Sequence, residues 1–265
     1  MYISHKHKFI YFGPTKVASN AVALIFTKLF NAEKVKPSQS FNGYCTDHHS
    51  VFLPKEYKDY LLIASVRNPF ERELSKYNYL ISELHKNQYE KEKLYWLLDE
   101  NDKLKEFSKY IDWVIDPTFK GVWHRQDAWK YSMTHQIFHN PVPHDCIPIT
   151  KIDKVLKCEN LKTDLISLEF IKNSNEIKSV FKMCDERYNV CSKQYAYFFP
   201  DACVERYLKA FKADFENFGY ETKVPTHIRE GLAKPSSPPN VKQTNFGGRT
   251  ITYIPKNDYK QIKIL

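Results

Sequence analysis

The stretch LLIASVRNPFERELSKY, residues 61–77, decides the fold of this chain. Its first four residues are a short apolar run, which is typical of a buried parallel strand. The run stops at Arg67-Asn68-Pro69, and Phe70, Leu74 and Tyr77 then recur on one stripe of a helix. The strand therefore delivers Arg67 to its carboxyl end, where open α/β sheets bind their ligands.

The chemistry of Arg67 indicates an anionic ligand at this sheet edge. Its guanidinium group is permanently charged and offers a planar fork of donors that suits a phosphate. Ser75 lies two helical turns further along the chain and can bring a hydroxyl group to the same anion. We therefore expect a phosphate-binding segment here.

Length and composition favour a single α/β domain rather than two. The chain has 265 residues, of which 42% are hydrophobic and 15% aromatic, so it can bury a sizeable core. No run approaches the roughly 20 apolar residues that a membrane-spanning helix needs. The start, MYISHKHKFIYFG, enters a strand-like segment directly and lacks the pattern of a secretory leader. We expect a soluble cytoplasmic protein, or a Golgi-lumen protein if an N-terminal anchor has been removed.

Charge and cysteine content exclude two further classes of protein. The net charge of +9 fits an anionic ligand, and a lysine-rich surface explains it equally well. The basic residues are dispersed along the chain, which argues against a nucleic-acid-binding protein. The six cysteines show no C-x-x-C pair and no zinc-like spacing, so we expect free thiols and no metal site. A Cys184–Cys191 disulfide is conceivable only in an oxidising compartment.

A second candidate phosphate site precedes the opening stretch. Residues 8–12, KFIYF, form a strand candidate, and residues 21–30 an amphipathic helix candidate. Between them lies GPTKVASN, residues 13–20. A strand, tight loop and helix in this order point backbone N–H groups and a helix N-terminus at a bound anion.

The remaining segments complete the expected organisation of a domain over residues 1–222. Residues 80–148 begin as charged helix, continue as a largely loop-like segment rich in proline, and hold all four tryptophans, so they are the candidate acceptor-binding region. A strand-like run over residues 153–161 ends near Glu159, and an amphipathic helix is expected over residues 201–218, with Gly219 as its C-cap. Residues 223–265 form a Pro- and Lys-rich tail that we expect to be extended.

A nucleotide kinase or other P-loop NTPase is the nearest rival interpretation. Its Walker A loop requires glycine directly before the lysine, whereas Lys16 follows Thr15. Such an enzyme also needs an aspartate at a second strand end to hold Mg²⁺, and this chain has Arg67 there. We keep this class as an alternative.

The segment at Arg67 resembles the 3′-phosphate-binding segment of sulfotransferases that use 3′-phosphoadenosine-5′-phosphosulfate (PAPS). In the Golgi-type and bacterial carbohydrate branch it reads V-R-N/D-P-x-x-R-x-x-S-x-Y. The matching residues here are Val66, Arg67, Asn68, Pro69, Arg72, Ser75 and Tyr77. The resemblance implies a three-layer α/β fold, with a central parallel sheet like that of the P-loop NTPases flanked by helices. It also implies PAPS as the donor, a metal-independent reaction, and 3′-phosphate binding by Arg67, Arg72 and Ser75.

The loop before the first helix is similar to the 5′-phosphosulfate loop of the same family. The family pattern is close to P-K-[TS]-[AG]-[ST]-[TS], and the expected cofactor-binding residues are Lys16, Val17, Ala18, Ser19 and Asn20. The chain departs from the pattern by inserting Thr15 between Pro14 and Lys16, and by carrying Val17 and Asn20 where hydroxyl residues stand. Lys16 is expected to neutralise charge on the leaving 5′-phosphate.

The resemblance also places a catalytic base. A histidine titrates near neutrality and can remove the proton of an attacking hydroxyl. In the carbohydrate branch, a histidine followed by a small residue serves as the base shortly before the arginine segment. Here His48-His49-Ser50 occupies that place, and His49 is favoured over His48. The implied acceptor is a hydroxyl group, and the branch favours that of a carbohydrate. A non-catalytic module that binds an anion or glycan on the same fold is the other alternative.

Overall fold

The computed structural model describes residues 1–35, 53–84, 106–116, 132–138, 146–185, 187–188, 199–229, 242–246 and 249–254. The chain divides into two compact units. Unit 1 comprises Met1–Arg67, Met133–Val190 and Asn240–Gln261. Unit 2 comprises Asn68–Ser132, Cys191–Pro239 and Ile262–Leu265.

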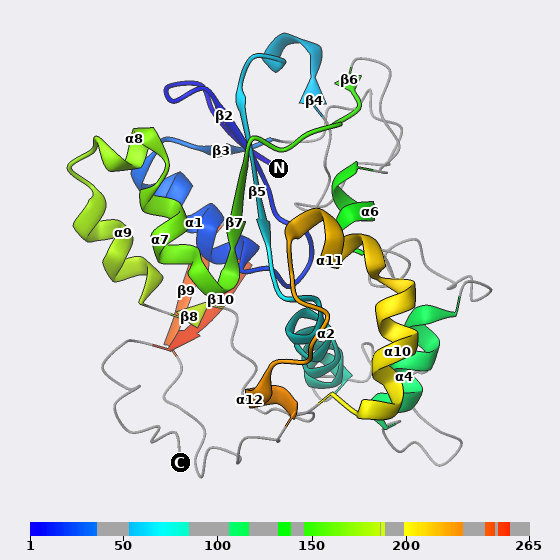
Figure 1. The fold of residues 1–265 in the computed structure, drawn as a ribbon. Helices are drawn as coiled ribbons and strands as arrows, with labels where there is room; N and C mark the ends of the chain where they lie inside the picture. Colours follow the sequence, from blue (N-terminus) through cyan, green and yellow to red (C-terminus); the bar gives the residue numbers. More distant parts are fainter. Residues whose placement is uncertain are drawn as a thin grey trace. The chain divides into compact units, whose positions relative to one another are not determined.

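Unit 1 is built on a five-stranded sheet with the order β3-β1-β2-β5-β7 (Figure 1). Its strands are β1 (Tyr2–Ser4), β2 (Phe9–Phe12), β3 (Glu33–Lys34), β5 (Leu61–Val66) and β7 (Lys154–Lys157). β2, β5 and β7 are parallel neighbours, whereas β1 is antiparallel to both β2 and β3. The predicted α/β class, with a mostly parallel sheet, is confirmed.

The two central strands form because their residues are apolar on both faces. All four residues of β2, FIYF, are buried, and so is β5 from Leu62 onward. Continuous apolar runs of this kind are typical of parallel strands that are covered on both sides. The strands predicted at residues 8–12 and 61–64 are therefore confirmed, with β5 extending two residues further to Val66.

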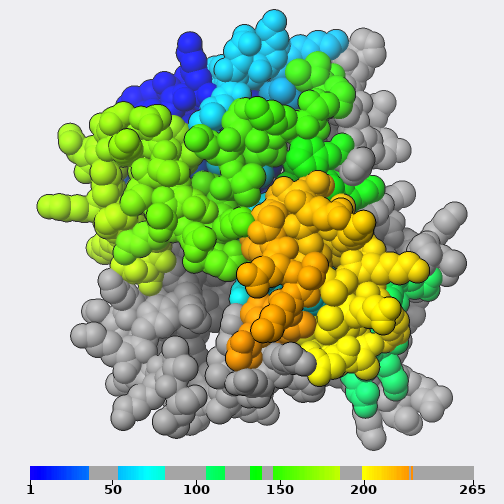
Figure 2. Space-filling model, in the orientation of Figure 1, coloured from blue at the N-terminus to red at the C-terminus, as the bar shows by residue number. Residues whose placement is uncertain are grey.

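Helices cover this sheet through a shared apolar cluster. The helices of unit 1 are α1 (Ser19–Leu29), α6 (Met133–Phe138), α7 (Leu161–Ile166), α8 (Glu169–Lys172) and α9 (Ile177–Cys184). Two 3-10 turns, η1 (Lys55–Tyr57) and η3 (Cys158–Asn160), precede β5 and α7. Buried side chains of α1, α7, α8 and α9 join those of β2 and β5 in one core cluster. In the space-filling view, α7, α8 and α9 form a continuous part of the surface (Figure 2).

Two smaller sheets complete unit 1. β4 (Leu53–Pro54) pairs with β6 (Cys146–Ile147). β10 (Arg249–Ile254) pairs with β8 (Arg187–Tyr188) on one side and β9 (Lys242–Phe246) on the other. The C-terminal tail, which was expected to be merely extended, thus contributes two paired strands at these residues.

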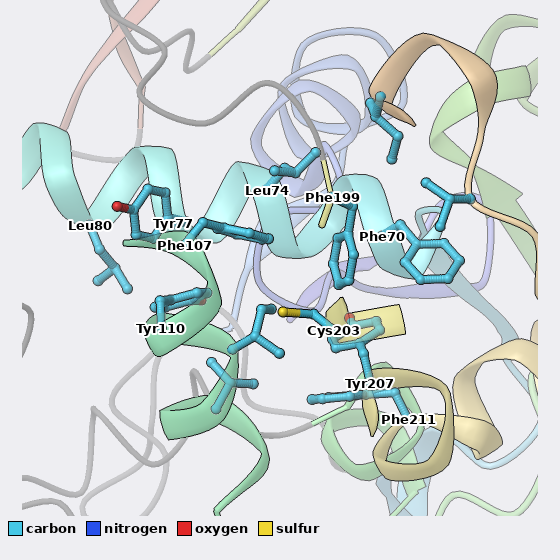
Figure 3. Packing of buried hydrophobic residues seen from close by; sticks show 14 of the residues in the cluster. Phe70, Leu74, Tyr77, Leu80, Phe107, Tyr110, Phe199, Cys203, Tyr207 and Phe211 are labelled. Carbon is cyan, nitrogen blue, oxygen red and sulfur yellow. The ribbon is translucent and has the colours of Figure 1, made fainter. Parts of the chain in front are cut away.

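Unit 2 is helical and packs around aromatic side chains (Figure 3). Its helices are α2 (Pro69–Leu84), α4 (Phe107–Ile115), α10 (Asp201–Ala210), α11 (Lys212–Phe218) and α12 (Thr226–Arg229). The ring centroid of Phe70 in α2 lies 4.9 Å from that of Phe199, 5.6 Å from that of Tyr207 and 5.2 Å from that of Phe215. The predicted stripe of Phe70, Leu74 and Tyr77 is the buried face of α2.

Two predicted elements differ from the structure. The single helix expected over residues 201–218 is two helices, α10 and α11, because Phe211 leaves the helical conformation at φ −111° and ψ 19° and α11 begins at Lys212.

 The C-cap is confirmed, since Gly219 ends α11 at φ 61°. In the segment predicted as largely loop, Met133–Phe138 forms α6.

Candidate active site

The loop between β2 and α1 alternates between buried and accessible residues. Gly13, Pro14, Thr15 and Val17 are buried, whereas Lys16, Ala18, Ser19 and Asn20 are half-buried. The Val17 side chain has no exposed surface because it packs into the core. Any contact of Val17 with a ligand therefore involves its backbone, and the accessible part of the loop begins at Lys16.

The backbone of this loop is strained at two residues. Lys16 has φ 66° and Ala18 has φ 59°, both in the left-handed region that residues with a Cβ atom seldom adopt. Each such residue costs about 1–2 kcal/mol. Ala18 is also the N-cap of α1, where it offers no side-chain hydrogen bond to the first turn. N–H groups at an uncapped helix start suit a bound anion, so this local geometry fits the phosphosulfate loop that the sequence predicts.

Gly13 is required by the close approach of the loop to α1. A Cβ atom on Gly13 would lie 2.3 Å from the Cβ atom of Ser19 and 2.9 Å from the hydroxyl oxygen of Tyr11. That hydroxyl group is itself buried and lies 2.6 Å from the Ser65 Oγ atom on the neighbouring strand. Burial raises the pKa of Tyr11, so this phenol stays protonated below the loop.

The sheet register brings the two candidate phosphate segments to one edge of unit 1. Phe12 of β2 lies opposite Ala64 of β5 in a parallel pair. Lys16 follows Phe12 by four residues, and Arg67 follows Ala64 by three. Both cations therefore follow the carboxyl ends of adjacent parallel strands, the edge at which such sheets bind ligands. Arg67 is half-buried there.

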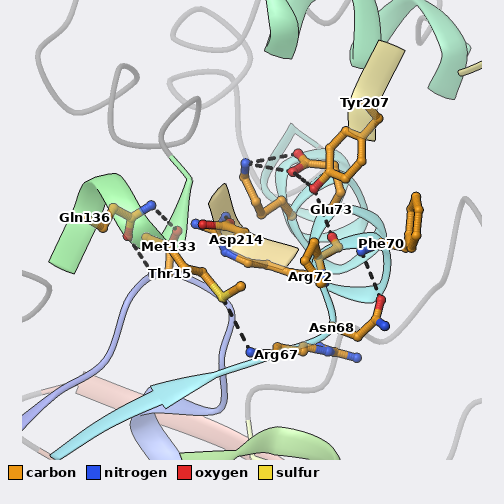
Figure 4. A network of polar contacts seen from close by, with 12 residues as sticks. Thr15, Arg67, Asn68, Phe70, Arg72, Glu73, Met133, Gln136, Tyr207 and Asp214 are labelled. Carbon is orange, nitrogen blue, oxygen red and sulfur yellow. Dashed lines mark hydrogen bonds and ion pairs between the residues drawn. The ribbon is translucent and has the colours of Figure 1, made fainter. Parts of the chain in front are cut away.

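Helix α6 contacts both of these segments, and sequence reasoning missed it. The Thr15 N–H group donates to the Gln136 Oε1 atom at 3.0 Å, and the Gln136 Nε2 atom donates to the Thr15 hydroxyl at 3.3 Å (Figure 4). The Arg67 N–H group donates to the Met133 sulfur at 3.4 Å. No local signal identifies this helix as part of the site, because Gln136 lies 121 residues from Thr15.

In unit 2, the turn after Arg67 starts helix α2. The Asn68 Oδ1 atom accepts hydrogen bonds from the N–H groups of Phe70 at 3.0 Å and Glu71 at 3.4 Å. Asn68 is thus the N-cap, and Pro69 takes the first helical position, where its missing N–H group has no cost. Ser75 lies on the same helix and is half-buried.

Arg72, predicted to bind the cofactor, is buried within unit 2. Its side chain has no exposed surface, and its Nη1 atom lies 3.9 Å from the Asp214 Oδ2 atom. This burial favours a structural part for Arg72 over direct contact with a ligand. The motif position is therefore better explained by the support that Arg72 gives to helix α2.

A second buried ion pair lies on the same helix (Figure 4). The Lys76 Nζ atom lies 3.0 Å from Glu73 Oε1 and 3.1 Å from Glu73 Oε2. The Tyr110 hydroxyl donates to Glu73 Oε1 at 2.6 Å, and the Tyr207 hydroxyl lies 3.2 Å from Glu73 Oε2 and 2.9 Å from the Pro69 carbonyl. Burial lowers the pKa of Lys76 to about 8, although the Glu73 carboxylate acts in the opposite direction. These groups fix α2 rather than face a ligand.

The other predicted residues lie outside the described residues or elsewhere within the two units. His48, His49 and the tryptophans other than Trp113 belong to the undescribed part of the chain. Trp113 packs against the core of unit 2. Glu159 is exposed in η3, directly after β7. Asp153 joins β7 to β5, because its Oδ2 atom accepts from the Leu62 N–H group at 2.9 Å.

Among the described residues, four cysteines carry free thiols, namely Cys146, Cys158, Cys184 and Cys203. In the same residues, no group of three or more histidine, cysteine and acidic side chains is placed to hold a metal ion. The described helices include none that combines the length and the apolar character needed to cross a membrane.

Comparison with known proteins identifies one family. A family model described as "Sulfotransferase family" matches residues 1–221. The match contains the whole Lys16 loop, Arg67 and helix α2. Neither the comparison with curated proteins nor that with solved structures gives a match.

Proposed function

The chain belongs to the sulfotransferase family, whose members are enzymes that use PAPS, and we propose that it sulfates a hydroxyl group of a carbohydrate acceptor. The observation that carries the proposed donor site is the pair of cations at one sheet edge. Lys16 and Arg67 follow adjacent parallel strands, β2 and β5. A donor with phosphate groups at both its 3′ and 5′ positions matches two separate cationic segments.

The proposed roles follow from the chemistry of these residues. Lys16, with the backbone N–H groups from Val17 to Asn20, binds the 5′-phosphosulfate. Arg67 binds the 3′-phosphate, and the family motif that the segment resembles implies Ser75 as a further ligand of that group. Arg72 acts indirectly, by its buried ion pair with Asp214.

The proposed transfer moves one sulfuryl group and one proton. The acceptor oxygen bonds to sulfur as the bond between sulfur and the 5′-phosphate oxygen breaks. His49 takes the proton of the acceptor hydroxyl, with His48 as its alternative. Lys16 neutralises the negative charge that develops on the leaving phosphate, a form of electrostatic stabilisation that needs no metal ion. The carbohydrate acceptor and the histidine base rest on the family branch that the Arg67 motif resembles.

A thermal-shift panel tests the donor assignment. The ligands are 3′-phosphoadenosine-5′-phosphate (PAP), adenosine 3′-phosphate, Mg-ATP and Mg-GTP, with PAP repeated in excess EDTA. A ligand that binds only the folded state raises the melting temperature by mass action. We expect PAP to stabilise the protein selectively, with or without EDTA. Selective stabilisation by Mg-ATP would contradict the proposal and favour a nucleotide kinase.

Turnover then separates an enzyme from a non-catalytic module. Incubation with radiolabelled PAPS and a panel of carbohydrate acceptors is expected to give labelled product. Binding of PAP without transfer to carbohydrate, lipid-linked, peptide or small-molecule hydroxyls would favour the module that only binds anions.

A further inference from the structure

The amide of Gln136 holds Thr15 through both of its ends. Its oxygen accepts from the Thr15 N–H group at 3.0 Å, and its nitrogen donates to the Thr15 hydroxyl at 3.3 Å. Because the two ends differ in chemistry, the pair of contacts defines one orientation of the amide. Gln136 is 4% exposed and Thr15 is 5% exposed, so water cannot readily replace either bond.

The same helix also contacts the segment at Arg67. Met133 and Gln136 are three residues apart in α6 and so lie on one face of that helix. The sulfur of Met133, a side chain with no exposed surface, accepts from the Arg67 N–H group at 3.4 Å. One short helix therefore links the loop after β2 to the end of β5.

The loop needs such a support because its conformation is strained. Thr15 directly precedes Lys16, and both Lys16 and Ala18 are in the left-handed region. Left-handed residues that carry a Cβ atom persist only where the surrounding structure imposes them. Gly13 and Thr15 both precede these strained residues. The two hydrogen bonds between Thr15 and Gln136, called the Thr15 clamp, and the close approach of Gly13 to Ser19 therefore hold the start of the loop in place.

The Thr15 clamp also limits which residues of the loop are available to bind an anion. The Thr15 N–H group already donates to Gln136, so the accessible residues that remain are Lys16, Ala18, Ser19 and Asn20. Thr15 is, moreover, the residue that this chain inserts into the family pattern between Pro14 and Lys16. The inserted residue therefore has its own hydrogen-bonding side chain in α6, Gln136.

We infer that Gln136 is a positioning residue for the 5′-phosphosulfate loop, acting through Thr15. This inference rests on the proposed function, since it assigns the loop to the 5′ end of the donor. In this role Gln136 acts through the loop and not on the reacting atoms. It holds the loop in the conformation in which Lys16 and the following N–H groups receive the phosphate.

The test compares two ligands that differ in the 5′-phosphate. Dissociation constants for PAP and for adenosine 3′-phosphate are measured by calorimetry with the full-length wild type, Gln136→Leu and Thr15→Val. Ile137→Val is the control, because it trims a side chain of the same helix that is 2% exposed and leaves both hydrogen bonds intact. Gln136→Leu is expected to weaken PAP binding about tenfold, a change within the net contribution of the two hydrogen bonds that it removes, and to leave the binding of adenosine 3′-phosphate unchanged.

The outcomes distinguish the inference from the proposed function. Equal PAP affinity in wild type and Gln136→Leu would overturn the inference, and so would equal weakening of both ligands. A wild type that binds neither ligand would instead contradict the proposed function. If Gln136→Leu does not fold, Thr15→Val decides, because it removes the hydroxyl contact in a side chain of similar volume. A selective loss of PAP affinity in Thr15→Val supports the clamp, and unchanged affinity overturns it.

Discussion

The Arg72 Nη1 atom lies 3.9 Å from the Asp214 Oδ2 atom, and neither side chain has any exposed surface. This pair joins helix α2 to helix α11 across 142 residues of sequence, the difference between 214 and 72. A charge that is buried without its partner is costly, whereas the net worth of the intact pair is small. The pair therefore makes the position of α2 depend on a helix near the end of the matched family region.

Removing one member of this pair is expected to destabilise the protein strongly. Asp214→Asn should lower the free energy of unfolding by about 3–5 kcal/mol, because it leaves the Arg72 charge buried without its carboxylate. Urea denaturation measures this change. The double variant Arg72→Met/Asp214→Leu should be more stable than Asp214→Asn alone. A double variant that loses the sum of the effects of Arg72→Met and Asp214→Leu, each measured singly, would argue against direct coupling.

Lys76 is expected to make stability rise with pH above neutrality. Its folded pKa, about 8, lies below the ordinary value of 10.5, so the unfolded chain binds more protons between these two values. Stability from this group therefore increases from pH 8 toward 10.5, by at most about 1.4 kcal/mol per pH unit. Urea denaturation at pH 7.5, 8.5 and 9.5 measures the slope. Lys76→Met should remove this rise in the free energy of unfolding with pH. Parallel pH profiles for the wild type and the variant would show that the rise does not come from Lys76.

Gly13→Ala is expected to damage the loop through a contact that cannot relax easily. The new Cβ atom would lie 2.3 Å from the Ser19 Cβ atom, which moves only with the backbone of α1. We expect a loss of about 1–3 kcal/mol in stability, together with weaker PAP binding. Gly13→Ala/Ser19→Gly removes the closest contact and should recover part of the stability. Equal stability of the single and double variants would mean that another contact dominates.

Arg67→Ala tests the proposed 3′-phosphate site. The variant should lose discrimination between PAPS and adenosine 5′-phosphosulfate, which lacks the 3′-phosphate, because charge-assisted bonds to that group disappear. Competition binding measures the ratio of the two affinities. Arg206→Ala is the control, since Arg206 is an arginine about half exposed on α10 and paired with Asp112. Discrimination that survives in Arg67→Ala would move the 3′-phosphate to another residue.

His49→Ala tests the proposed base. Turnover should fall by about 10²-fold or more, whereas the dissociation constant for PAP should stay near that of the wild type. Single-turnover transfer and calorimetry measure the two quantities separately. His48→Ala is the paired control, and a larger fall in that variant would assign the base to His48 instead.

Local sequence determined the elements that carry the candidate site. An apolar run predicts β5, an Asn68-Pro69 turn predicts the start of α2, and both are present. Such signals are local because side-chain burial on a strand and capping of a helix depend on residues a few positions apart. The family motif was readable for the same reason, since it occupies contiguous residues. By contrast, no proline or glycine near Phe211 indicates the break between α10 and α11.

Tertiary structure decided how those elements are supported. Thr15 and Gln136 are 121 residues apart, and Arg72 and Asp214 are similarly distant, so no spacing rule connects either pair. Arg72 illustrates the consequence, because a motif arginine predicted to bind the donor has its charge paired inside unit 2. Sequence alone thus determined the α/β class and the family, and it predicted the two candidate phosphate segments. Packing decided which of their side chains remain accessible, because burial depends on neighbours that only the folded chain brings together.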